Sequence, residues 1–197
     1  MTQLERQQRG LLALIKNQDV IIDDPYLEEV AGSRGLAMLR EIAIWWRALQ
    51  LEAQCRFTSR LLKRLGCFDA MVSTYFNCHP TSPFIEELSR SFLCSLHPHP
   101  DPLIRSVSQF EWALMQARTG SAKSFEVPWD RHPDLVIVAL DKGSELPAED
   151  REYRYRMRIG CEIPALVSCT REPKVSPRYS CQGFGSSCSS FLPNIGL

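Results

Sequence analysis

Apolar residues recur at helical spacing along the first two thirds of the chain. In the stretch from Leu36 to about Cys55, four of them step by three, four and three residues: Leu39, Ile42, Trp46 and Leu49. This spacing predicts one long helix with a single apolar face turned toward the core. Adjacent residues diverge by about 100° on a helix, so we expect Trp46 in the core and Trp45 at a flank or a contact surface.

Start and stop signals divide the surrounding sequence into further helices. Thr2 and Glu5 form a capping box, in which the side chain of each residue accepts a hydrogen bond from the backbone N–H of the other. A helix near residues 3–17 is predicted to follow. Two shorter helices, at 57–65 and 68–76, are separated by a glycine.

The last helix of this region has the clearest boundaries. Asp101 is a cap, Pro102 fits the first helical position, and Gly120 ends the helix. Its apolar face carries Leu103, Val107, Phe110 and Leu114. We expect Phe110 to be buried there, and Trp112, about 200° around the helix, to pack against the C-terminal part of the chain.

The pattern changes after Gly120 from helical to mixed. Residues 125–129 alternate as in a short strand, whereas 133–143 fit either a short helix or a buried strand, because the β-branched run and the length favour different structures. The clearest strand has one face that carries Tyr153, Tyr155, Met157 and Ile159 and another that carries Arg154, Arg156 and Arg158. This period of two defines a half-buried strand.

The final residues have no sustained periodicity. Residues 170–197 are rich in serine, glycine and proline and include Cys181 and Cys188, a composition typical of disorder. The sequence therefore predicts a mainly α fold. It comprises an N-terminal helical bundle domain (1–120), a small C-terminal mixed α/β appendage (121–169) and a disordered Ser/Cys/Pro tail (170–197).

Charge does not select a class of partner. The chain has 197 residues, and its 23 Lys and Arg residues balance its 23 Asp and Glu residues. No global field therefore favours nucleic acid or a membrane surface. No signal-peptide pattern opens the sequence, and its apolar runs are too short to span a bilayer, so we expect a cytoplasmic protein with no membrane partner.

Cysteine and histidine positions argue against a metal centre. The eight cysteines include no CxxC pair, so we expect reduced thiols. His97 and His99 precede prolines, which favour polyproline geometry and make side chains two apart diverge by about 120°. The best metal set would add Cys78 and His79, but adjacent residues rarely bind one ion and no carboxylate stands at a known ligand spacing. We predict neither a structural metal nor a cofactor.

Enzyme motifs are also missing from the sequence. No GxGxxG, GxxxxGK[ST], HExxH or GxSxG segment is present. The paired carboxylates Glu86-Glu87 and Asp23-Asp24 fit a helix start and a turn. We therefore expect a protein that is not an enzyme.

Two helical segments carry a family resemblance. They read FTSRLLKRLGCFDAMVSTYFNCHPTSPFIEELSRSFL from Phe57 and PLIRSVSQFEWALMQA from Pro102. The aromatic at Phe57, the Leu-Leu and Gly of 61–66, the aromatic, Pro and Ser of 75–82 and the Glu-Trp-Ala of 111–113 resemble the helical N-terminal domain of HvfC/BufC-type proteins. The resemblance covers about residues 4–120.

The chain departs from this family in two places. Thr58 stands where the family usually has proline, and the region after Gly120 is shorter than the family's second domain. The family carries a DNA-binding label. Its members also resemble partner proteins that present a ribosomal precursor peptide to a multinuclear non-haem iron enzyme, which modifies the cysteines of that peptide.

These two functions place the site on different residues. Peptide presentation needs an open strand edge or an apolar groove, and the candidate strand carries Tyr153, Arg154, Tyr155, Arg156 and Arg158. A DNA-binding transcriptional regulator instead needs clustered cations that neutralise phosphates. Its candidates are Arg56, Arg60, Lys63 and Arg64. We expect the peptide-presenting role, with DNA binding as the alternative.

Overall fold

The computed structural model describes residues 2–16, 23–79, 82–120, 124–161, 163 and 166–174. Within these residues the helices are α1 (Gln3–Ile15), α2 (Pro25–Ala31), α3 (Arg34–Gln54), α4 (Arg56–Arg64), α5 (Phe68–Cys78), α6 (Ile85–Ser95), α7 (Pro102–Arg118) and α8 (Pro133–Lys142). The strands are β1 (Phe125–Trp129), β2 (Tyr153–Ile159) and β3 (Val167–Pro173). The predicted class, mainly helical with a small C-terminal α/β part, is confirmed.

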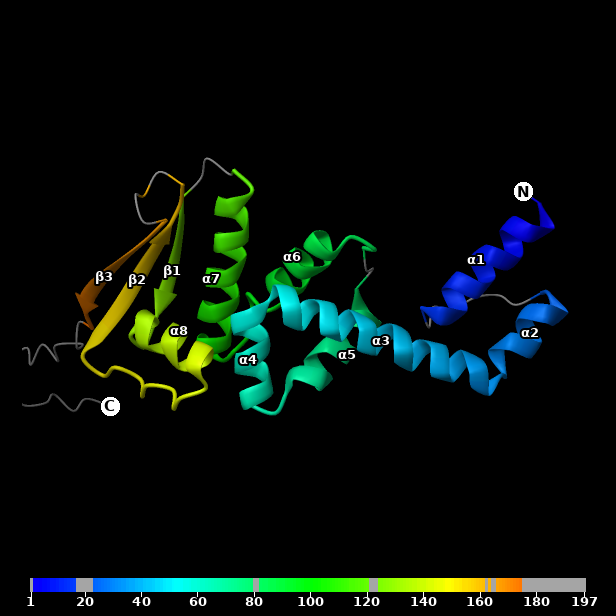
Figure 1. The fold of residues 1–197 in the computed structure, drawn as a ribbon, viewed down its shortest axis with the longest axis horizontal. Helices are drawn as coiled ribbons and strands as arrows, with labels where there is room; N and C mark the ends of the chain where they lie inside the picture. The colour runs from blue at the N-terminus through cyan, green and yellow to red at the C-terminus, as the bar shows by residue number, and fades with distance from the viewer. Residues whose placement is uncertain are drawn as a thin grey trace, which may run out of the picture.

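The molecule is elongated, with α3 as its longest element (Figure 1). One end of α3 carries the α1–α2 pair, and the other joins the bundle of α4, α5, α6 and α7. The sheet and α8 lie beyond α7, at the far end of the molecule. The capping box of Thr2 and Glu5 and the cap of Asp101 on α7 form as the sequence predicts.

The main core runs through the helical bundle and continues between α7 and the sheet. Phe110 is buried, and its ring contacts those of Phe57 and Trp129 at centroid distances of 6.1 and 5.9 Å. Trp112 meets Phe125 of β1 edge to face at 5.1 Å. Both expectations for α7 are therefore confirmed, and α7 is the element that joins the bundle to the sheet.

A second, much smaller core lies at the opposite end. Leu14, Leu27 and Leu36 hold α1, α2 and the first turn of α3 together. The close approach of α1 to α2 depends on Gly10, since a Cβ there would come within 2.3 Å of a Leu27 methyl carbon. Arg40 also links α3 to α1, because its guanidinium donates two hydrogen bonds to the Leu14 carbonyl oxygen.

The long helix α3 does not bury the face that the sequence predicts. Trp46 is 54% exposed, and Leu39, Ile42 and Leu49 are exposed as well. The prediction of Trp46 in the core is wrong because α3 meets the bundle through a different side. That side includes the fully buried Leu51, about 200° around the helix from Leu49.

The C-terminal part forms a three-stranded antiparallel sheet in the order β1, β2, β3. Residues 133–142 form a helix, which ends where Gly143 adopts a positive φ of 73°. The tail boundary predicted at Thr170 is wrong, because Thr170 pairs with Arg156 inside β3. The rest of the predicted tail, 175–197 with Cys181 and Cys188, lies outside the described residues.

Candidate functional site

The alternating strand forms as the sequence predicts. Tyr155, Met157 and Ile159 of β2 are buried against the helices, and Tyr153 is half-buried. Arg154, Arg156 and Arg158 are exposed on the opposite face of the sheet. The aromatic and aliphatic side chains therefore anchor the strand, and its guanidinium groups face away from the core.

The position of β2 within the sheet differs from the expectation of an open edge. β2 lies in the centre, paired with β1 from Phe125 to Trp129 and with β3 from Val167 to Pro173. Its backbone N–H and C=O groups therefore have partners on both sides, and no further strand can pair with it. The interpretation of Arg154–Ile159 as an open edge is wrong because residues 167–173 occupy that edge.

The arginines of β2 are partly neutralised by carboxylates on neighbouring strands. Arg156 donates to Glu126 on β1 at 3.1 Å and pairs with Glu172 on β3 at 3.4 Å, and both interactions raise the pKa of its guanidinium. Arg158 Nε lies 3.7 Å from Glu126. All these groups are about half exposed, so the pairs contribute little to stability. The outer face is a mixed-charge surface.

Of the two outer strands, β1 is poorly suited to pair with an added strand. The register of β1 on β2 alternates, so the backbone groups of Pro128 point away from β2. Proline has no N–H to donate. Its carbonyl oxygen accepts a hydrogen bond of 2.6 Å from Ser106 on α7. The helix α7 therefore covers this edge.

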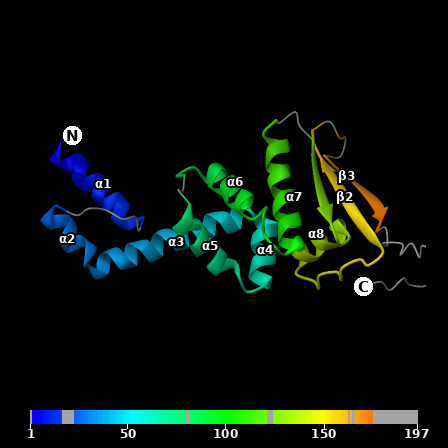
Figure 2. The ribbon, with the colours of Figure 1, turned by 180° about the vertical axis from the view of Figure 1, so that it is seen from behind.

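Among the described residues, no backbone group pairs with the outer edge of β3. Lys174 N donates to Glu152 O, and Gly160 N donates to Leu166 O. These two bonds fix the alternation of the ladder, in which Thr170 faces β2 whereas Cys169 and Arg171 point their N–H and C=O groups outward. Figure 2 shows β3 at the side of the sheet farthest from α7.

The side chains along β3 leave this edge accessible. Ser168 to Pro173 are all exposed. The guanidinium of Arg171 lies 3.3 Å from the ring centroid of Tyr153 and covers that half-buried ring. Cys169 is exposed as a residue, but partial desolvation of its thiol raises the thiol pKa, and the nearby carboxylate of Asp134 raises it further. These groups support recognition by backbone pairing, and a raised thiol pKa disfavours nucleophilic chemistry.

A hydrogen-bonded corner holds the start of β2 in place. The Tyr155 hydroxyl donates to Asp150 at 2.6 Å, and this bond is the main reason that the pKa of Asp150 is lowered. The other oxygen of Asp150 accepts the backbone N–H groups of Glu152 and Tyr153, each at 3.0 Å. The edge strand β3 therefore pairs with a strand whose position is fixed by its own side chains.

The basic residues of α4, proposed for DNA, all have partners within the protein. Arg56 and Arg60 both pair with Asp141, and Arg60 also donates to the carbonyl oxygens of Leu140 and Asp141. Arg64 donates to Gly143 O at 3.0 Å, and Lys63 pairs with Glu52. Three of these four cations therefore bind the C-terminal end of α8, where free carbonyls and the helix dipole favour positive charge.

The two histidines considered for a metal site, His97 and His99, have different partners within the protein. The His97 ring packs edge to face against Trp112 at 5.6 Å, whereas His99 Nδ1 accepts the backbone N–H of Asp101 at 3.1 Å. Among the residues that the structure describes, no three His, Cys, Asp or Glu side chains are arranged to hold a metal ion. In the same residues, no helix combines the length and apolarity needed to cross a bilayer.

Two features of this region were missed in the sequence. The edge strand β3 was assigned partly to the tail, although Val167 and Cys169 alternate with Ser168 and Thr170 in a short period-two pattern. The second is Glu111, a buried carboxylate that bonds to α4. Its signal was a charged residue at helical spacing from Ile104 and Val107, on the buried side of α7.

Comparison of the chain with protein-family models, with curated proteins and with solved structures finds no match. The resemblance of residues 4–120 to HvfC/BufC-type proteins stays a prediction.

Proposed function

We propose that the chain is a non-catalytic partner protein that binds an extended precursor peptide along β3 and presents it to an iron-dependent modifying enzyme. The observation that carries the peptide-binding part is the outward backbone of Cys169 and Arg171 on an exposed edge strand. The iron enzyme as second partner rests on the family resemblance alone. The proposal assigns no catalytic residue and no cofactor to this chain.

Strand addition gives the binding its energy. A peptide that pairs with β3 gains the N–H and C=O groups of Cys169 and Arg171, up to about four hydrogen bonds at a net of about 1 kcal/mol each. Pairing stops at one end because Pro173, the next outward residue, has no N–H. The site therefore fits a short extended segment.

Charge gives the site its preference among peptides. An added strand lies about 10 Å from β2, which is two interstrand spacings. Arg154, Arg156 and Arg158 therefore attract an added strand mainly by long-range electrostatics. Arg171 on β3 is its direct neighbour. Because Glu126 and Glu172 neutralise part of this charge, the preference for an acidic leader peptide is moderate and falls with salt.

The test uses a display library of random linear peptides selected on the full chain, followed by titration of an enriched peptide. Cys169→Pro removes one outward N–H and keeps the ladder to β2, so it should weaken binding about tenfold, the factor for about 1.4 kcal/mol. Cys169→Ala is the matched control, because it changes the same side chain and keeps the N–H. Equal affinity of wild type and Cys169→Pro would contradict strand addition.

The DNA-binding alternative makes the opposite prediction when the same variants are titrated with a DNA duplex. If α4 bound phosphates, Arg60→Gln and Arg64→Gln would weaken binding to a random DNA duplex with a strong salt dependence, and Cys169→Pro would have no effect. The partners of these arginines on α8 favour the peptide function over this one.

A further inference from the structure

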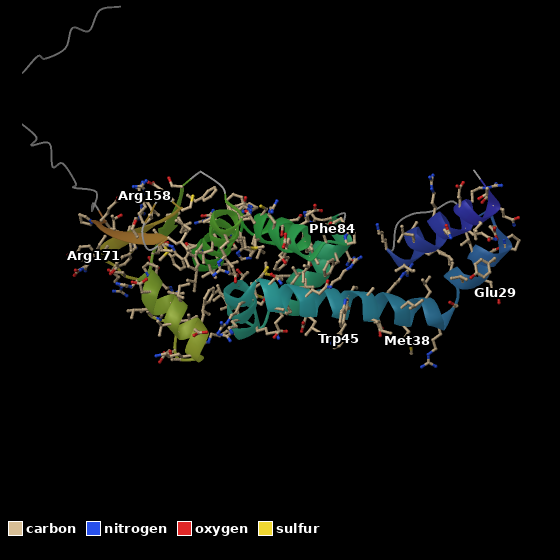
Figure 3. All side chains as sticks on the ribbon, turned by 45° about the horizontal axis from the view of Figure 1, so that its top comes forward. Glu29, Met38, Trp45, Phe84, Arg158 and Arg171 are labelled. Atoms are coloured by element: carbon tan, nitrogen blue, oxygen red, sulfur yellow. The ribbon has the colours of Figure 1, made fainter. Side chains whose placement is uncertain are left out.

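The middle of α3 is an apolar helix that no other described part of the chain covers. From residue 37 to residue 50 no side chain of α3 is buried. Six large apolar residues there are exposed: Met38 59%, Leu39 52%, Ile42 52%, Trp45 63%, Trp46 54% and Leu49 44%. Figure 3 shows Met38 and Trp45 on the side of α3 away from the labelled Phe84.

These six residues form one continuous surface, called here the α3 face. Their helical positions span an arc of about 120°, at 100° per residue. Their exposed area is roughly 600–700 Å², larger than the biggest apolar patch of most monomeric proteins. Helices that expose so much apolar surface normally bury it against a partner.

We propose that a second copy of this chain covers the α3 face, with the two α3 helices packed antiparallel about a two-fold axis near Ile44. The spacing of Leu39, Ile42, Trp46 and Leu49 is three, four and three, and it reads the same in both directions. Antiparallel pairing therefore places Leu39 opposite Leu49 of the partner subunit and Ile42 opposite Trp46 of the partner subunit. Such a surface is complementary to itself, as a two-fold interface requires.

The area of the α3 face is sufficient for this partner. Two copies together would bury roughly 1,200–1,400 Å², which lies within the range of specific protein interfaces. The two tryptophans stand near the centre of the patch, where such residues contribute most of the binding energy. A self-complementary patch of this size needs no other molecule.

The charges around the face disfavour DNA and membranes. Arg40 and Arg47 on α3 point to their own chain, where Arg40 bonds to Leu14 O and Arg47 lies over the Phe76 ring. Glu41 flanks the exposed side, and Glu52 farther along α3 is paired with Lys63, so this flank carries no net positive charge. A bilayer or a phosphate backbone would require cations at that position.

The arrangement explains why the α1–α2 pair stands so far from the bundle. With the axis near Ile44, Arg34 at the start of one α3 lies level with Gln54 of the partner subunit. Each α1–α2 pair then flanks the bundle of the other copy, and the two sheets lie at opposite ends of the dimer. This inference stands independently of peptide binding at β3.

The test measures the mass of the full chain in solution by sedimentation velocity and light scattering over a range of micromolar concentrations. The expected mass is about 45 kDa, twice the 22.5 kDa of one chain. Ile42→Glu should raise the dimer dissociation constant about a thousandfold, because a symmetric interface contains each substitution twice. Leu39→Glu should have a similar effect, and both positions are exposed in the single chain, so circular dichroism should stay unchanged.

Two further variants complete the test. Leu135→Glu is the control, since Leu135 on α8 is 55% exposed and lies outside the α3 face, and it should remain dimeric. The double variant Ile42→Lys and Trp46→Glu brings opposite charges together across the interface only in the antiparallel register, so it should dimerise better than either single variant. A wild-type mass near 22.5 kDa at all concentrations would overturn the dimer, and failure of the double variant to recover would overturn the antiparallel register.

Discussion

Removal of the Glu111 carboxylate should separate α4 from α7. Helix α4 starts at Arg56 without a side-chain cap of its own. Instead, the buried Glu111 of α7 accepts the backbone N–H groups of Phe57 and Thr58, each at 2.9 Å. A residue more than fifty positions away therefore satisfies two of the free donors in the first turn of α4.

The size of the effect follows from these two bonds. In Glu111→Ala both N–H groups lose their acceptor, at about 1–3 kcal/mol each, while relief of the buried carboxylate offsets part of the loss, so we expect about 3 kcal/mol. This lowers the melting temperature by about 6–12 °C, at about 2–4 °C per kcal/mol for a chain of this size. Glu111→Gln keeps one acceptor oxygen and should lose about 1 kcal/mol.

The dependence on pH provides a second signature. Burial raises the pKa of Glu111 above its ordinary value of 4.5, against the opposing effect of the Thr58 and Phe57 donors. The folded state then binds the proton more tightly than the unfolded state. The stability that this group contributes is complete below pH 4.5 and decreases as pH rises through the folded pKa.

The assay is urea unfolding of wild type and Glu111→Gln at a series of pH values, because the difference between the two cancels the other titrating groups. The advantage of wild type over Glu111→Gln should shrink as the pH rises above about 4.5. An advantage of wild type that grows with pH would refute the reasoning. So would a Glu111→Ala variant whose unfolding free energy lies within about 0.5 kcal/mol of wild type, which is the usual scatter of neutral surface substitutions.

Two other substitutions test the packing. Phe110→Ala, at the contact of Phe57 and Trp129, should cost about 3–5 kcal/mol in urea unfolding, and a loss below about 1 kcal/mol would mean that the ring is not in the core. Truncation after Cys169 removes residues 170–173, which pair with β2, so it should lower the melting temperature by several degrees. An unchanged melting temperature would show that this half of β3 adds nothing to the fold.

Local patterns predicted most of the elements but not how they pack. The caps of Thr2 and Asp101 and the alternation of Tyr153 to Ile159 depend on neighbours in sequence, and these predictions are confirmed. The face of α3 that contains Trp46 was predicted correctly as apolar and wrongly as core. Periodicity identifies an apolar face, but it does not say which surface covers it.

The candidate site depended on contacts between distant residues. Arg56 and Arg60 looked like free cations because their partner, Asp141, lies about eighty residues further along the chain. The strand β3 was missed because its stability comes from pairing with Tyr153–Ile159 and not from its own composition. Only the pairing showed which strand is central and which has an open edge.

Strand addition at β3 is tested most directly by amide hydrogen exchange at single residues, measured by NMR with and without a selected peptide. The outward N–H groups of Cys169 and Arg171 should exchange at least about tenfold more slowly in the complex, since each gains a hydrogen bond. Thr170, which already faces β2, should change little. Unchanged exchange at Cys169 and Arg171, with slowing at Arg60 and Arg64 instead, would contradict the account and place the bound molecule on α4.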